Sequence, residues 1–268
     1  MSGYRISVIM PSLNEAENIG RAVRNVAQAF ERYGIEGEII IVNDGSTDDT
    51  GLIAAGLAAK HPFLRVLRHE KPQGIGASFW DGVGNAGGEI VTMIPGDGEN
   101  DAAETLRYLP VMEHVDIVVP YVFNKEVRSA GRRLLSALYR GIVNTSFGLT
   151  LNYMNGTVMY RRCVLQGITF RSRGFFYQTE LLIKCIRKGY LYAEVPYALE
   201  RRAAGASKAT TLASLLKVTR NYMTVLADIY LKGGAGGGIA PDSVTAKRRG
   251  RTGEGGIAEA ADEGKGVR

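Results

Sequence analysis

Hydrophobic and polar positions alternate along the first half of the chain in blocks that predict strands and helices in turn. The segment Asn14–Tyr33 carries apolar residues at helical spacing. Glu15 and Glu17 fall in its expected first turn, where the helix dipole favours acids, and Gly34 is expected to end the helix. The strands predicted in this half are Arg5–Met10, which stops at Pro11, then Glu38–Val42, Leu64–Arg68, Glu89–Ile94 and Val115–Pro120. The further helices are Thr50–Lys60, Gly74–Ala86 and one that starts at about Asp101.

Repeated strand–helix units of this length predict an α/β fold, with a mostly parallel sheet and helices on both of its faces. Ligands of such sheets bind at the carboxyl ends of the strands. Polar, acidic turns follow three of the predicted strands, at Asn14-Glu15, at Asp44 and at Asp97. We therefore expect the binding site at this edge.

The second half of the chain is less regular. Helices are predicted at Ala130–Phe147 and Phe176–Lys188, and strands at Gly156–Tyr160 and Tyr190–Val195. The segment Leu212–Leu231 is apolar but interrupted by charged residues, which indicates an amphipathic helix that lies on a bilayer or packs against the domain. After Lys232 the chain becomes glycine-rich, charged and free of aromatic residues, so residues 233–268 are expected to be disordered.

Composition and charge narrow the possible partners. The 268 residues are 45% hydrophobic and 22% charged, as in an ordinary soluble protein, and the net charge of +6 suits anionic partners such as nucleotides, lipid phosphates or a membrane surface. No uninterrupted run of eighteen apolar residues and no signal peptide is recognisable, so the cytoplasm is the expected location. Cys163 and Cys185 lack metal-ligand spacing and are expected to be structural thiols, and the three histidines are scattered.

The individual acidic turns are weak signals, but together they suggest metal–diphosphate chemistry. Carboxylates repel a diphosphate and bind it only through a divalent ion such as Mg²⁺ or Mn²⁺. Asp97 and Glu99 lie two residues apart beyond a predicted strand and are the candidate ligands. The sequence has no Gly-Lys-Ser/Thr phosphate loop, and its glycines at 74, 76 and 82 do not form a dinucleotide fingerprint. A P-loop ATPase and a Rossmann-type oxidoreductase are therefore disfavoured.

Taken in order, the motifs are much more specific. The segments SVIMPSLNE (7–15), IVNDGSTD (41–48) and GDGEND (96–101) resemble those of the inverting family 2 glycosyltransferases. Further similarity to the polyprenyl-phosphate (dolichol-phosphate) mannosyl- and glucosyltransferase branch lies at Asn155-Gly156, Tyr160–Arg162, Gln178-x-Glu180, Glu194–Pro196 and Arg202-x-x-Gly205-x-Ser207-Lys208. The resemblance extends from about Arg5 to Tyr230.

This resemblance implies a GT-A fold, in which a nucleotide-binding α/β sheet merges with acceptor-side helices. We accordingly expect one domain over residues 1–232, with a nucleotide-sugar-binding half at 1–122 and an acceptor-side half at 123–232 that ends in the amphipathic helix. The implied reaction transfers a hexose, with inversion, from a GDP-mannose- or UDP-glucose-type donor to a polyprenyl phosphate. No nucleic acid is expected as a partner, and a lipid acceptor implies peripheral contact with the inner face of the cell membrane.

The resemblance also implies roles for particular residues. The nucleotide-binding set is Pro11, Leu13, Glu15, Val42 and Asp44, with Asp44 bonded to the base. Asp97 and Glu99 are the implied metal ligands, and Arg202 and Lys208 the cations that meet donor or acceptor phosphates. The acceptor phosphate is expected at Arg132, Arg133 and Ser136. Glu180 is either the general base for a hydroxyl acceptor or a residue that orients acceptor-side groups.

One position departs from the family pattern. The family's Asp-x-Asp motif predicts a carboxylate at position 95, where this chain has Pro95, and Glu99 stands where relatives usually carry glutamine. Two alternatives to the polyprenyl-phosphate enzyme therefore stay open at the level of sequence. One is a soluble family 2 enzyme with a hydroxyl acceptor, and the other is a nucleotide-sugar-binding protein with little or no catalysis.

Overall fold

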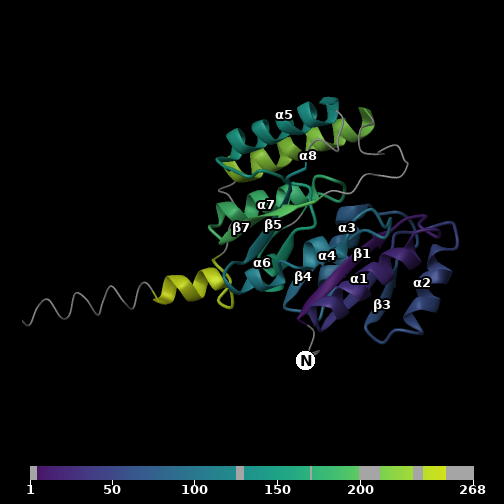
Figure 1. The fold of residues 1–268 in the computed structure, drawn as a ribbon. Coiled ribbons are helices and arrows are strands. Elements are labelled where there is room, and N and C mark those ends of the chain that lie inside the picture. The colour runs from purple at the N-terminus through teal and green to yellow at the C-terminus, as the bar shows by residue number, and fades with distance from the viewer. Residues whose placement is uncertain (1–4, 125–129, 170, 199–211, 232–237, 252–268) are drawn as a thin grey trace, which may run out of the picture.

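The computed structural model describes residues 5–124, 130–169, 171–198, 212–231 and 238–251, and Figure 1 shows their arrangement. They contain one seven-stranded sheet in the order β3-β2-β1-β4-β6-β5-β7. Its strands are β1 (Ile6–Ser12), β2 (Gly37–Asn43), β3 (Leu64–Arg68), β4 (Ile90–Met93), β5 (Ile117–Val122), β6 (Met159–Arg161) and β7 (Tyr192–Tyr197). The helices are α1 (Ile19–Tyr33), α2 (Thr50–Ala58), α3 (Ile75–Asn85), α4 (Ala102–Leu106), the 3₁₀ helix η1 (Leu109–Glu113), α5 (Ala130–Phe147), α6 (Arg162–Gln166), α7 (Tyr177–Arg187) and α8 (Leu212–Tyr230).

The sheet is parallel except at β6, which runs antiparallel to both β4 and β5. β1 lies between β2 and β4, and every residue of β1 and β2 is buried, as expected for strands covered on both faces. Strands from both predicted halves join in this sheet, since β6 and β7 of the second half pair with β4 and β5 of the first. The predicted mostly parallel α/β sheet with helices on both faces is confirmed.

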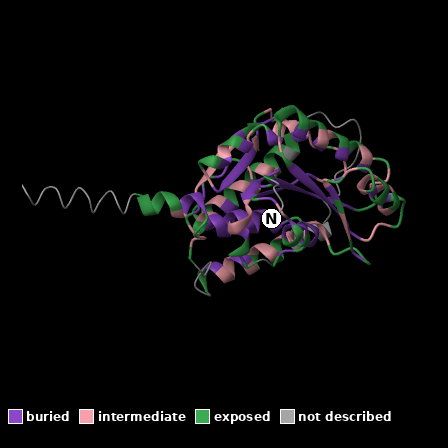
Figure 2. Ribbon diagram, turned by 90° about the horizontal axis from the view of Figure 1, so that it is seen from below, coloured by how far each residue is buried: buried purple, intermediate pink, exposed green. Residues whose placement is uncertain are grey.

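Two apolar cores lie on the two faces of the sheet. One core packs α1, α2, α4 and η1 against the sheet, and the other contains residues of α3, α5, α6, α7 and α8. The side chains of a single strand alternate between them, so that Ile9 belongs to one core and Val8 and Met10 to the other. Figure 2 shows the buried strands inside the molecule and exposed positions along the outer helices.

Helices α5 and α8 lie side by side beyond α7 (Figure 1). The hydroxyls of Ser146 and Tyr222 are 2.6 Å apart, and the Tyr230 hydroxyl donates to the Ser146 carbonyl at 2.6 Å. Large apolar side chains on the outside of α5 are exposed: Leu134, Leu135, Leu138 and Ile142. None of the helices in the described part of the chain combines the length and hydropathy needed to cross a membrane.

The first strand and helix differ from their predicted bounds. β1 continues through Pro11 to Ser12, because the Pro11 carbonyl still accepts a hydrogen bond from Gly96 N at 3.0 Å although proline donates none. The predicted helix start at Asn14 is wrong. α1 begins at Ile19, and Asn14 has a left-handed backbone with φ 57°. Glu15 and Glu17 therefore lie before the helix rather than in its first turn.

The prediction of disorder after Lys232 is wrong for residues 238–251. Residues 244–251 are helical, and Val244, Thr245 and Ser243 are buried. The fully buried carboxylate of Asp116, just before β5, accepts hydrogen bonds from the amides of Val244 at 2.7 Å and Thr245 at 3.0 Å. The prediction from composition failed because the few apolar residues of this segment pack against a site that the rest of the domain provides.

Candidate active site

Two loops at the carboxyl edge of the sheet are tied together where β1 and β2 end. Asn14 N donates to Ser46 Oγ at 3.0 Å, and the Asn14 side-chain oxygen accepts from Thr47 N at 2.9 Å. Glu15 N donates to Thr50 Oγ1 at 2.8 Å. These polar bonds explain why the chain from Asn14 onward is a loop, and they bring two of the three predicted acidic turns together.

Asp48 strengthens the same junction. Its carboxylate accepts from the Thr50 hydroxyl at 2.5 Å and from Ala16 N at 3.1 Å. The hydrogen bond from Thr50 is the main reason why the pKa of Asp48 lies below its ordinary value of 3.8. The charged form is therefore the form that this loop geometry favours.

The third acidic turn, Pro95–Glu99, lies beside the first. Gly96 N donates to the Pro11 carbonyl, and a side chain at position 96 would collide with Ser12 and with Ile19 at the start of α1. Asp97 Oδ1 accepts from Glu99 N at 3.0 Å, which makes the turn compact. The three turns that the sequence placed at one edge thus meet there.

Asp97 is half-buried and Glu99 exposed, both beyond the end of β4. Among the described residues there is no cluster of three or more histidine, cysteine or acidic side chains fit to hold a metal by themselves. Mg²⁺ needs no such cluster, since it commonly binds one or two carboxylates together with substrate phosphates. Asp97 and Glu99 fit an ion whose remaining ligands come from the phosphates of the donor. The side chain of Pro95 adds no ligand.

Arg21, on the first turns of α1, is a neighbour of this turn that sequence reasoning missed. A Cβ atom on Gly98 would lie 2.9 Å from both Nε and Nη2 of Arg21, so the guanidinium lies against the turn between Asp97 and Glu99. Arg21 Nη2 also donates to Asn18 Oδ1 at 3.1 Å. A positive charge therefore stands next to the two candidate metal ligands.

Of the expected nucleotide-binding residues, Pro11 and Val42 face each other in the β1–β2 register, and both are buried. Leu13 is exposed and Glu15 half-buried. Asp44 is buried, and its carboxylate accepts from the amides of Gln73 at 2.8 Å and Gly74 at 2.9 Å. The carboxylate of Asp44 thus holds the loop before α3, a role that its place in the motif did not indicate.

Glu180 is fully buried on α7. Its carboxylate accepts from Arg171 N at 3.2 Å and Ser172 N at 2.8 Å, and it pairs with Lys184 Nζ at 2.5 Å, one helical turn along α7. A carboxylate enclosed in this way by two amides and an ammonium group is arranged to hold a loop. The geometry favours the orienting role over the general base, the other role that the sequence left open.

The loop that Glu180 holds connects several elements. The Arg173 carbonyl accepts from Gly76 N at 2.8 Å, at the start of α3. Arg171 Nε lies 3.1 Å from the carboxylate of Asp228 on α8. Residues 171–173 therefore join α3 to α7 and α8.

The remaining acceptor-side residues lie on α5 or outside the described residues. Arg132, Arg133 and Ser136 are in the first two turns of α5; Arg133 is exposed and Ser136 half-buried. α5 belongs to the outer layer that it forms with α8 (Figure 1). Arg202 and Lys208 lie outside the described residues.

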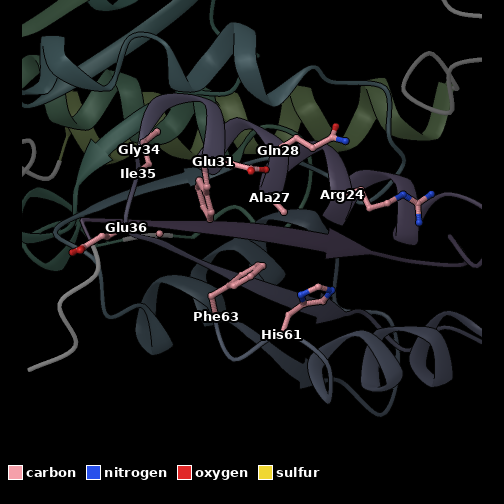
Figure 3. Close-up of a pocket in the computed structure, with 11 residues that line it drawn as sticks. Arg24, Ala27, Gln28, Glu31, Gly34, Ile35, Glu36, His61 and Phe63 are labelled. Atoms are coloured by element: carbon pink, nitrogen blue, oxygen red, sulfur yellow. The ribbon is translucent and has the colours of Figure 1, made fainter.

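A groove of about 1010 Å³ lies at the other edge of the sheet. Phe30 of α1 lines it. Figure 3 shows Glu31 of α1 and the turn residues His61 and Phe63 before β3 around it. The groove therefore stands at the amino ends of β2 and β3, away from the acidic turns, and is not part of the candidate active site.

Comparison with known proteins decides the family. The model of "Glycosyl transferase family 2" matches residues 7–178, which include the three acidic turns and end just before Glu180. The chain belongs to glycosyl transferase family 2. The matched residues of this family 2 glycosyltransferase include the Asp97 turn, Pro95–Glu99.

Two curated relatives agree with this assignment. The chain is 30% identical over 217 residues to the polyprenol monophosphomannose synthase of Mycolicibacterium smegmatis, across 76% of this chain and 80% of that protein. It is 28% identical over 212 residues to the dolichol-phosphate mannosyltransferase of Pyrococcus furiosus, across 76% of this chain but only 59% of that longer protein.

Solved structures show that the fold of this family 2 glycosyltransferase is GT-A. Glucosyl-3-phosphoglycerate synthase from Mycobacterium tuberculosis in complex with UDP matches with a TM-score of 0.63 at 22% identity, over 84% of this chain and 80% of that one. The same enzyme with Mn²⁺, UDP and glucosyl-3-phosphoglycerate matches with a TM-score of 0.60 at 23% identity, over the same shares of the two chains.

Proposed function

We propose that this glycosyltransferase moves a hexose from a nucleoside-diphosphate sugar to a polyprenyl phosphate, with inversion at the anomeric carbon. The donor is of the GDP-mannose or UDP-glucose type and lies over the carboxyl edge of β1, β2 and β4. The names of both curated relatives, a polyprenol monophosphomannose synthase and a dolichol-phosphate mannosyltransferase, support this acceptor class. The three tied acidic turns support the position of the donor.

The observation that carries the acceptor assignment is the burial of Glu180. A hydroxyl acceptor must lose its proton to a general base, and Glu180 was the candidate for that base. Its enclosed carboxylate is ill placed for this chemistry, because two amides and Lys184 already occupy it. A phosphate monoester has a second pKa of about 6, so it is largely dianionic at neutral pH and attacks without a base.

In the proposed mechanism, Asp97 and Glu99 would hold a divalent ion together with the phosphates of the donor. When bound, Mg²⁺ or Mn²⁺ neutralises the charge that develops on the departing nucleoside diphosphate. Structural neighbours solved with Mn²⁺ or Mg²⁺ support a metal of this kind. The guanidinium of Arg21, packed against the Asp97–Glu99 turn, offsets part of the negative charge of the two carboxylates.

The basic residues of the proposed acceptor half neutralise the charge of the phosphates that they bind. We propose that Arg132, Arg133 and Ser136 bind the acceptor phosphate, and that Arg202 and Lys208 bind donor or acceptor phosphates through charge-assisted hydrogen bonds. The acceptor phosphate has to be brought within reach of the anomeric carbon while these cations neutralise its charge. Catalysis then rests on positioning and charge neutralisation rather than on proton removal.

We further propose that the outer layer of α5 and α8 contacts the cytoplasmic face of the membrane. Leu134, Leu138 and Ile142 on α5 are each more than half exposed, as are Met223 and Tyr230 on α8. An apolar face of this kind lying in the lipid interface would bring the site to the phosphate end of a polyprenyl chain.

A donor and acceptor panel tests the proposed function. The unfolding temperature is measured with GDP, UDP and their sugars, with and without Mn²⁺. The increase identifies the nucleobase of the donor, because a ligand that binds the folded state raises its stability. Transfer of radiolabelled sugar is then measured to a polyprenyl phosphate, to the matching polyprenol and to a soluble glycan. Product on the phosphate alone supports the proposal. Product on the polyprenol or the glycan supports the hydroxyl-acceptor alternative, and nucleotide binding without any transfer supports a binding protein.

A further inference from the structure

A buried histidine, outside every motif discussed so far, stands between two carboxylates next to the proposed donor pocket. His69 follows β3 directly and is 8% exposed. Its Nδ1 lies 2.7 Å from Asp44 Oδ1, and its Nε2 lies 3.0 Å from Asp81 Oδ2 on α3. The amide of His69 also donates to the Asn43 carbonyl at 2.9 Å, which fixes the backbone beside β2.

The two contacts favour one protonation state of the ring. Ionised carboxylates only accept hydrogen bonds, so a ring nitrogen that bonds to one must donate. Both nitrogens of His69 face a carboxylate, and both contacts form only when the ring is the doubly protonated imidazolium. The geometry of the cluster therefore suits a cation between two anions, with Asp44 on the loop after β2 and Asp81 on α3.

Asp44, the more buried of the two carboxylates, fixes the shape of the loop that leads into α3. Asp44 accepts from the amides of Gln73 and Gly74 in addition to facing His69. Gly45 lies so close to this loop that a side chain there would collide with the backbone of Lys71 and Pro72. The orientation of Asp44 thus fixes how the loop after β2 meets the loop before α3.

Asp81, the other carboxylate, is much more exposed than Asp44. The Asp81 side chain is 51% exposed, whereas that of Asp44 is 6% exposed. Without a cation between them, Asp81 can turn to solvent, but Asp44 keeps its charge in a buried place with only the two amides as partners. His69 is consequently the group whose loss changes Asp44 most.

We propose that His69, as an imidazolium held between Asp44 and Asp81, is the positioning residue that sets the donor pocket of this enzyme. The inference rests on the proposed function, because it takes the nucleotide to bind beside Asp44. His69 does not touch the reacting atoms. It acts through Asp44 on the 73–74 loop, so its loss weakens donor binding much more than it slows transfer from bound donor.

The test combines a spectroscopic and a kinetic readout. Ring ¹⁵N NMR of the full-length protein at pH 7.5 is expected to show two protonated nitrogens on His69. His69→Gln is expected to raise the donor KM at least tenfold and to leave kcat within about threefold. His61→Gln, a histidine at the amino edge of the sheet, is the matched control and should change neither constant.

A second pair of variants separates positioning from folding. Asp81→Asn alters the half-exposed outer partner, so it keeps the fold and should raise the donor KM by a smaller factor than His69→Gln. In the double variant His69→Gln/Asp81→Asn, the introduced glutamine donates its amide to Asp44, and its side-chain oxygen accepts from the introduced asparagine amide at position 81. The donor KM of the double variant should therefore return toward the wild-type value.

Two results would overturn the inference: a single protonated ring nitrogen on His69, or a donor KM that neither His69→Gln nor Asp81→Asn changes. Failure of the proposed function looks different. In that case GDP, UDP and their sugars would not bind to the wild-type protein, although the NMR signature of the imidazolium would persist; the donor-positioning role of His69 would fall together with the donor.

Discussion

The amide of Gly76 donates to the carbonyl of Arg173 at 2.8 Å, and this bond joins the start of α3 to the loop before α7. Gly76 stands at the start of α3, close to the loop that Asp44 holds. Arg173 ends the short loop that Glu180 holds through two amides. Two buried carboxylates, Asp44 and Glu180, thus fix the two loops that meet at this bond.

Gly76→Ala should break this junction. A Cβ atom there would lie 2.5 Å from the Ser172 carbonyl oxygen and 2.8 Å from Tyr177 Cβ, so the two loops must separate. We expect a lower midpoint of urea unfolding and reduced transfer activity. Gly84→Ala on the same helix is the control, because its Cβ meets nothing within 4 Å and alanine stabilises an exposed helix position by about 0.5–1 kcal/mol. Equal effects of the two substitutions would contradict the account.

Glu180→Gln should act mainly on stability. Removing one partner of a buried ion pair leaves the other charge uncompensated, which typically costs about 3–5 kcal/mol. The exposed pair of Arg5 and Glu113 provides the control, since Glu113→Gln should cost less than about 1 kcal/mol. Urea titration measures both variants. A Glu180→Gln enzyme with wild-type stability and no turnover would instead identify Glu180 as a catalytic base.

Asp116→Asn should destabilise the protein without affecting catalysis. An asparagine can accept only one of the two bonds from Val244 N and Thr245 N, and a buried amide without its partner costs about 1–3 kcal/mol. We expect a lower Tm with an unchanged donor KM, because Asp116 precedes β5 at the amino edge. Asp242→Asn, an exposed residue of the same C-terminal segment, should leave both unchanged. Full stability of Asp116→Asn would show that residues 238–251 do not depend on this docking site.

Cys185 should be unreactive in the native enzyme. Burial raises the pKa of its thiol to about 12, and the thiolate is the reactive form. Below that pH the group stays protonated, so at pH 8 a thiol reagent is expected to label Cys185 only after denaturation. Peptide mass spectrometry before and after addition of urea measures this. Rapid labelling of Cys185 in the folded protein at pH 8 would contradict its place in the core.

Much of this architecture follows from local sequence pattern. The strand Leu64–Arg68 and the helix Ala130–Phe147 were predicted with the bounds that the structure gives them, because apolar periodicity and flanking turns define them. The meeting of the acidic turns was also predictable, since parallel strands end at the same edge. The start of α1 was not, because side chains of the 46–50 loop, more than thirty residues away, bind the backbone that would otherwise have begun the helix.

The roles of buried polar residues depend on tertiary contacts that no local pattern contains. His69 follows a predicted strand at the carboxyl edge, and that position was the one available signal of its involvement; its carboxylate partners come from the loop after β2 and from α3. Glu180 was found from its motif, but only the structure revealed the two amides and Lys184 around it. The docked segment 238–251 was missed because its partner, Asp116, lies more than a hundred residues earlier in the chain.

We propose that a divalent metal at the Asp97 turn assists the transfer of a sugar from a nucleotide donor to a polyprenyl phosphate. The most direct measurement is the rate of labelled-sugar transfer to polyprenyl phosphate by the wild-type enzyme with Mn²⁺, by the same enzyme with EDTA, and by Asp97→Ala. Asp242→Asn serves as the control. We expect EDTA and Asp97→Ala each to lower the rate at least a hundredfold, about 2.7 kcal/mol of transition-state stabilisation, and Asp242→Asn to leave it unchanged. Wild-type transfer by Asp97→Ala, or transfer that EDTA leaves unchanged, would contradict the proposal.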